Sequence, residues 1–163
     1  VLDGGLALAD LLARRDPAAT NDMVSELAFG AYNKTFKPNR TAYDWLSLDQ
    51  ENVDAYIADP MCGHDATVGL FREMLRGIRF NQRRENLRRM DGSIPVLLIS
   101  GEDDPVGGMG EGVRRTYQAF RDAGVADCTL KLYPKLRHEL LNERAQRETV
   151  YQDIWNWMEA KLG

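Results

Sequence analysis

Cysteine and histidine are both scarce in this chain, and their scarcity limits the kinds of site that it can form. The 163 residues include two cysteines, Cys62 and Cys128, and two histidines. Two cysteines so far apart in the sequence are too few for a disulfide framework or a zinc site. A reducing, cytoplasmic setting is the expectation for a chain of this kind.

Long apolar runs and an excess of positive charge are also missing. No hydrophobic stretch approaches the roughly 20 residues that a membrane-spanning helix needs. The formal net charge is −4, whereas a nucleic-acid-binding face is basic, so we expect no nucleic-acid partner. A content of 44% hydrophobic and 28% charged residues is typical of a globular domain with a core of its own.

Helical patterns fill the first ninety residues. The predicted helices, in chain order, span residues 6–15, 21–32, 49–58, 68–78 and 80–90, the last of them strongly basic. Asn21 is suited to cap the second helix, because its side chain can accept a hydrogen bond from a free backbone N–H. The polar residues 33–41, which include Pro38, predict a loop.

The pattern changes to strands and helices from residue 94 onward. Residues 95–99 form a short apolar run, typical of a parallel strand buried on both faces. Residues 129–133 alternate like an edge strand, with Leu130 and Leu132 on the covered face. Helices are predicted between the strands, over residues 112–123, and after them, from Val150 to Met158. This order predicts one right-handed βαβ crossover and a closing helix, an α/β arrangement.

Two parallel strands are too few for a stable sheet with helices on both faces. The chain also opens on Val1 rather than on a methionine, and its first residues do not resemble a signal peptide. We therefore expect the chain to begin inside a longer protein whose N-terminal half carries the remaining strands. Any targeting segment would lie upstream as well.

An acid and a histidine follow the two predicted strands. Asp104 lies in Gly-Glu-Asp-Asp-Pro-Val after the first strand, and His138 lies in Pro-Lys-Leu-Arg-His-Glu after the second. Side chains beyond the carboxyl ends of parallel strands share one edge of the sheet, where ligands bind. A catalytic histidine needs an acid on its far ring nitrogen, and Asp104 is placed for that role. The alternative is that Asp104 is an ordinary turn residue before Pro105 and that His138 is a surface residue.

These two segments together resemble the C-terminal signature of the α/β-hydrolase superfamily. Three segments closer to the N-terminus resemble the cap of its monoacylglycerol lipase/lysophospholipase-like serine hydrolases of bacteria: residues 29–34, residues 44–47 and residues 56–63. The resemblance runs from about residue 21 to the end. It implies a partial α/β-hydrolase fold, in which a helical cap (residues 1–65) precedes the last two parallel strands and their helices (residues 66–163).

The same resemblance implies a function in which Asp104 is the acid and His138 the general base of a catalytic triad. The reaction would be hydrolysis of carboxylic esters resembling monoacylglycerols or lysophospholipids, through an acyl-enzyme and without a metal or organic cofactor. The nucleophile of the family stands in Gly-x-Ser-x-Gly, and no stretch of this chain has that pattern. The partner expected first is therefore the N-terminal half of the same protein, which would hold the serine.

Several residues have alternative interpretations. The neighbouring acids Glu102 and Asp103 compete with Asp104, although the family places its acid directly before Pro-Val. His64 near Cys62 is a weak metal pair, and the glycines of residues 107–112 fit no phosphate-binding loop. Some cap aromatics and Met61 could line an acyl-chain pocket.

The class of protein and its partners also remain open. The run of arginines between residues 76 and 89 is a solvated helix face or, alternatively, a contact for anionic lipid at a membrane surface. A peptidase or haloalkane-type hydrolase would share the same acid and base. The rival from another class is a truncated, non-catalytic remnant or helical interaction module.

Overall fold

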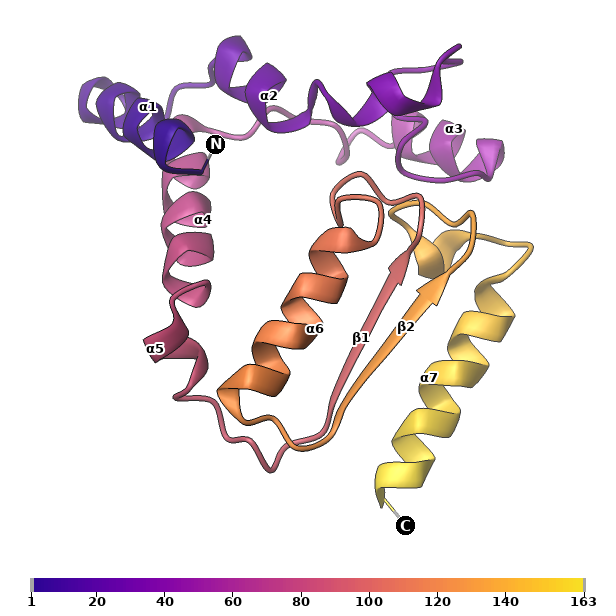
Figure 1. Ribbon diagram of the computed structural model, residues 1–163. Helices are drawn as coiled ribbons and strands as arrows, with labels where there is room; N and C mark the ends of the chain where they lie inside the picture. Colours follow the sequence, from indigo (N-terminus) through magenta and orange to yellow (C-terminus); the bar gives the residue numbers. More distant parts are fainter. Residues whose placement is uncertain (1, 163) are drawn as a thin grey trace.

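The computed structural model describes residues 2–162, in which helices surround a small parallel sheet (Figure 1). The N-terminal part contains helices α1 (Leu2–Arg15), α2 (Asp22–Phe29), the 3-10 helix η1 (Tyr32–Phe36) and α3 (Gln50–Ala58). The remainder contains α4 (Val68–Asn81), α5 (Arg84–Leu87), β1 (Val96–Gly101), α6 (Glu111–Ala123), β2 (Cys128–Tyr133), η2 (Leu140–Asn142) and α7 (Arg147–Leu162). Within this range no helix is long and apolar enough to cross a membrane.

Side-chain caps fix where several of these helices begin. Oδ1 of Asn21 accepts a hydrogen bond from the Val24 N–H at 3.2 Å, which confirms the predicted cap of α2. Asp49 caps α3 and Thr67 caps α4 in the same manner. Each cap pairs a backbone N–H that the first helical turn leaves free.

Helices α1 and α4 pack against each other at one end of the molecule (Figure 1). Ala9 and Ala13 of α1 are buried, as are Val68 and Phe71 of α4. The small alanine side chains let the two helices approach closely. Helix α4 thus contacts the segment expected to form the cap, although it follows the predicted boundary at residue 65.

The two strands form a parallel pair in which Val96 lies beside Cys128 and Gly101 lies beside Tyr133. Helix α6 connects the strands and packs on one face of the sheet. Helix α7 covers the other face, where Tyr133, Leu136, Leu140 and Val150 form a buried cluster with Ile99 and Ile154 packed against it. The predicted βαβ unit and closing helix are confirmed.

Four local predictions differ from the structure. Residues 96–99 of β1 are half-buried rather than buried on both faces, because β1 has a neighbouring strand on one edge only within residues 2–162. Tyr133 of β2 is buried in the cluster with α7, so the face expected to be open is covered at that end of the strand, although Lys131 on the same face is exposed. The predicted loop 33–41 begins with the helix η1, and the basic helix expected over residues 80–90 is reduced to α5.

Candidate functional site

Asp104 lies in a tight turn directly after β1. One carboxylate oxygen, Oδ1, accepts a hydrogen bond from the Val106 N–H at 2.9 Å, and the Asp104 carbonyl accepts one from the Met109 N–H at 2.8 Å. The residue is only 7% exposed. Aspartate favours this geometry because its side chain can pair with the backbone two residues ahead. The turn therefore holds Oδ2 in a fixed direction.

Oδ2 of Asp104 points to His138, which lies in the loop after β2. Its distance to the imidazole Nδ1 is 3.2 Å. A hydrogen bond donated by Nδ1 to a carboxylate leaves the other ring nitrogen, Nε2, free to act as a base. The His138 side chain is 39% exposed, so the ring is accessible from outside.

Backbone contacts hold the two loops together. The Glu102 N–H donates to the Tyr133 carbonyl and the Asp103 N–H donates to the Leu136 carbonyl, each at 2.9 Å. Gly101 permits this approach, because a Cβ at that position would lie 2.0 Å from the Leu136 carbonyl oxygen. The acid and the histidine are thus brought together by backbone hydrogen bonds rather than by their own contact alone.

The hydrogen bond between the two side chains shifts both pKa values. It raises the pKa of His138 above its ordinary value, against the opposing effect of burial. Burial by itself would raise the pKa of Asp104, but the hydrogen bonds from His138 and from the Val106 N–H outweigh it and lower that pKa. Both shifts favour a charged pair, as expected for an acid that supports a histidine base.

Aromatic side chains lie against this pair. The ring centroid of Trp45 is 5.3 Å from that of His138, and the centroid of Tyr32 is 5.2 Å from that of Trp45. Phe29, which is partly exposed, and the buried Phe71 of α4 continue the series. Burial and the nearby negative charge of Asp104 raise the pKa of Tyr32.

Sequence reasoning missed a set of polar residues that surround the histidine. Arg137, directly before His138, stacks its guanidinium 4.0 Å from the ring centroid of Phe36. Asp44 and Glu143 are buried nearby, and Glu143 accepts a hydrogen bond from the Leu48 N–H at 2.8 Å. These residues fall within the segments that carry the family resemblance, but no spacing rule indicates that segments about ninety residues apart are in contact.

The other candidate residues take no part in the pair. The Asp103 backbone N–H donates to the Leu136 carbonyl, and the carboxylate hydrogen-bonded to His138 is that of Asp104. Glu102 forms an ion pair with Arg114, with 3.7 Å between its carboxylate Oε1 and the guanidinium Nη2. His64 contacts the Pro60 carbonyl, and residues 2–162 contain no group of three acid, histidine or cysteine side chains placed to hold a metal ion. Met61 is 83% exposed.

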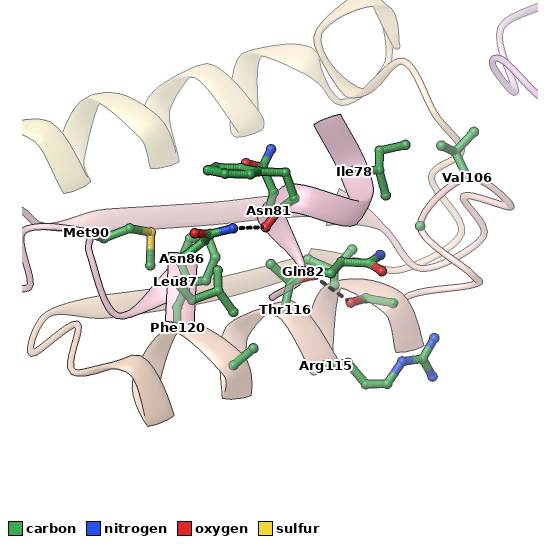
Figure 2. A pocket seen from close by; sticks show the side chains of 15 residues that line it. Ile78, Asn81, Gln82, Asn86, Leu87, Met90, Val106, Arg115, Thr116 and Phe120 are labelled. Atoms are coloured by element: carbon green, nitrogen blue, oxygen red, sulfur yellow. Dashed lines mark hydrogen bonds between the residues drawn. The ribbon is translucent and has the colours of Figure 1, made fainter. Parts of the chain in front are cut away.

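A cleft of about 1050 Å³ lies between α4, α5 and α6 (Figure 2). Its walls carry the apolar side chains Ile78, Leu87, Met90, Val113 and Phe120. Asn86 donates a hydrogen bond to the Phe80 carbonyl at 2.8 Å within this wall. Val106 and Gly107 connect the cleft to the turn of Asp104, but neither Asp104 nor His138 lines it.

The pair can move a proton but does not include a nucleophile. The chain has four serines, Ser25, Ser47, Ser93 and Ser100, and within the described range none of them is hydrogen-bonded to His138. Ser100 donates instead to the carbonyl of Gly101, and Ser93 donates to Asp91. The free nitrogen Nε2 of His138 therefore has no serine partner among residues 2–162.

The helices, the parallel strands and the position of the acid–histidine pair define a partial α/β-hydrolase fold. The chain belongs to the serine aminopeptidase S33 family, whose model matches residues 8–145. A monoacylglycerol lipase of Mycolicibacterium smegmatis is 34% identical over 124 residues, which amount to 73% of this chain and 40% of that protein.

Solved structures share the fold. A thermostable carboxyl esterase from Bacillus coagulans, determined in complex with glycerol, superposes with a TM-score of 0.89 at 24% identity, covering 98% of this chain and 52% of that one. A monoacylglycerol lipase of Paleococcus ferrophilus gives a TM-score of 0.66 at 21% identity, covering 93% and 50%. The chain thus spans about half the length of these structures and less of the curated relative.

Proposed function

We propose that this chain supplies the acid, Asp104, and the general base, His138, of a serine hydrolase that cleaves carboxylic esters. The observation that carries the proposal is the 3.2 Å contact between Oδ2 and Nδ1, made by residues of the two loops that follow the parallel strands β1 and β2. The serine and its oxyanion-binding N–H groups would come from a further part of the same protein. That the chain spans about half of its relatives supports this division.

In the proposed reaction, Nε2 of His138 takes the proton of the serine hydroxyl while the serine oxygen attacks the ester carbonyl. The resulting imidazolium gives this proton to the leaving alcohol, and an acyl-enzyme remains. Water then attacks the acyl-enzyme with His138 again as the base, which releases the acid and restores the serine. Asp104 keeps the imidazole in the required tautomer and stabilises its charged form throughout.

The proposed substrates are esters of the monoacylglycerol or lysophospholipid kind. Support comes from the names of the relatives and from the aromatic series Trp45, Tyr32 and Phe29, which leads away from His138. In this proposal residues 1–65 act as a cap over the site, and residues 66–163 belong to the core. The exposed arginines of α4 and α5 remain candidates for contact with an anionic membrane surface.

Other parts of the proposal concern the setting of the protein. Cys62 and Cys128 are both free thiols, which fits a reducing, cytoplasmic compartment. The family description names an aminopeptidase, so hydrolysis of an aminoacyl amide is a second candidate activity. A truncated, non-catalytic remnant or interaction module is the third, because the chain has no Gly-x-Ser-x-Gly segment.

The first test is the coding region upstream of Val1. A Gly-x-Ser-x-Gly segment in the same reading frame supports the hydrolase, whereas a start codon at Val1 supports the remnant. The full-length protein is then assayed with a monoacylglycerol, a lysophospholipid and an aminoacyl p-nitroanilide. Ester turnover that is lost in His138→Ala supports the proposal. Turnover of the anilide alone would contradict it and favour a peptidase activity instead.

A further inference from the structure

The segment from Phe36 to Asp49 and the loop from Arg137 to Arg144 are joined by polar contacts across the chain. The guanidinium Nη1 of Arg137 donates to the carbonyl oxygens of Asp44 and Ser47, the latter at 3.1 Å. Its planar face lies over the ring of Phe36. Two hydrogen bonds from one nitrogen, together with a stacked face, restrict both the position and the orientation of the group that carries them.

The contacts continue on the other side of His138. The Glu139 N–H donates to the Leu46 carbonyl at 2.8 Å, so both chain neighbours of His138 are anchored to residues 44–47. Trp45, in the middle of that segment, places its ring against the imidazole. Trp45 therefore restricts the imidazole from one side, and Asp104 restricts it at Nδ1.

Arg137 is a half-buried cation beside His138. Burial lowers the pKa of Arg137, while the negative charges of Asp44, Glu143 and Asp103 oppose that effect. None of these three carboxylates forms an ion pair with it, and its polar partners are backbone carbonyl oxygens. The hydrogen bonds from this guanidinium to backbone oxygens hold the 44–47 segment beside the histidine loop.

We propose that Arg137 is a positioning residue for His138: its hydrogen bonds to the 44–47 segment and its stacking on Phe36 hold the imidazole in line with Asp104. The inference rests on the proposed function, because it gives Arg137 a part in that reaction without contact with the substrate. It extends the site from the acid and histidine to a segment that lies about ninety residues earlier in the chain.

The consequence for His138 follows from the groups that face it. Asp104 approaches from the turn after β1, the charged residues Arg137 and Glu139 are its chain neighbours, and Trp45 approaches from the N-terminal part. Of these, the bond to Asp104 contributes most to the raised pKa of His138. If Arg137 is shortened or made apolar, the imidazole spends less time on Asp104 and its pKa falls toward about 6.5.

The experiment compares Arg137→Met with Arg144→Met in the full-length protein. Arg144 is a matched control, because it also ties the histidine loop to the earlier segment, through ion pairs with Asp49 and Glu51, but it is half-exposed and six residues beyond His138. We expect Arg137→Met to lower kcat by about 10²-fold, the effect of a misplacement of about 1 Å, with little change in KM. The acidic limb of the pH profile should move to lower pH.

Equal losses of kcat in the two variants would overturn the inference. So would an acidic limb of the pH profile that stays in place in Arg137→Met, because either result reduces Arg137 to a general structural contact. Arg137→Lys keeps the charge and a donor nitrogen but not the planar group that stacks on Phe36, and should recover only part of kcat. If Arg137→Met does not fold, Phe36→Leu removes the stacking alone, and the same shift of the limb is expected of it.

A measurement without turnover separates this inference from the proposed function. NMR of the full-length protein follows the His138 imidazole, whose signal is assigned as the one that is lost in His138→Ala. A lower His138 pKa in Arg137→Met but not in Arg144→Met supports the positioning role even if no ester is cleaved. Ester turnover with an unchanged His138 pKa in both variants refutes the positioning role and leaves the proposed function standing.

Discussion

Oδ2 of Asp104 lies 3.2 Å from Nδ1 of His138, although 34 residues and the whole of α6 separate the two in the chain. The contact follows from the parallel pairing of β1 and β2, which brings their carboxyl ends to one edge of the sheet (Figure 1). The backbone bonds from Glu102 and Asp103 to the next loop make the approach rigid. In the proposed reaction, an acid so placed acts on the histidine and not directly on a substrate.

The raised pKa of His138 predicts the pH dependence of the full-length protein. A base must be unprotonated to act, so the acidic limb of kcat/KM should lie above about pH 6.5, the ordinary value for histidine. NMR titration of the His138 imidazole, assigned by the loss of its signal in His138→Ala, measures the same pKa without substrate. A value below 6.5 would show that burial, and not the bond to Asp104, determines the protonation of His138.

The 163-residue chain by itself should not hydrolyse esters. The nucleophile and the oxyanion donors supply most of the rate in triad enzymes, and the described residues bring no serine to His138. The test is turnover of a short aryl ester together with labelling by a fluorophosphonate probe. Covalent labelling of a serine in this chain alone would contradict the division of the site between two parts of a protein.

Leu136 connects the core to the site and offers a test of stability. It is fully buried in the cluster between β2 and α7, two residues before His138. Leu136→Ala should lower the free energy of unfolding of the full-length protein by about 2–5 kcal/mol, through lost burial and the cavity left behind. Leu162→Ala, at a position that is 88% exposed, is the control and should change it by less than about 0.5 kcal/mol. Equal effects in chemical denaturation would contradict the assigned core.

The chain alone should also associate or remain molten in solution. Residues 96–99 of β1 are only half-buried, and Ile94, Phe80 and Trp155 are each more than half exposed. A strand edge without a partner presents free backbone donors and acceptors to other molecules. Light scattering and thermal unfolding measure the outcome. A monodisperse monomer with a sharp, cooperative transition would show that the helices supply a sufficient core by themselves.

Local chemistry made much of the fold predictable. Asn21 caps α2 because short polar side chains pair with free N–H groups, and the apolar spacing of α4 matched its period of 3.6 residues. The strand–helix–strand order predicted the parallel pair of strands. Because the loops after parallel strands lie at the same edge of the sheet, it also predicted that Asp104 and His138 are neighbours.

Long-range contacts account for what the sequence did not reveal. The helix η1 forms where a loop was expected because Asn33 bonds to the Thr41 carbonyl and accepts from the Trp45 N–H, contacts that no local pattern signals. The contact between Arg137 and the Asp44 carbonyl depends on the folded path of two distant segments. Tyr133 was assigned to the exposed side of its strand because the sequence does not show that α7 covers it.

The most direct test of the account compares two adjacent acids in the full-length protein. Asp104→Asn should lower kcat on the order of 10⁴-fold, because an amide cannot hold His138 in the required tautomer, and His138→Ala should be at least as severe. Asp103→Asn should lose little, because that side chain is not bonded to His138. Steady-state turnover of a monoacylglycerol by the three variants measures this. A severe loss in Asp103→Asn with a mild one in Asp104→Asn would contradict the assignment of Asp104 as the acid.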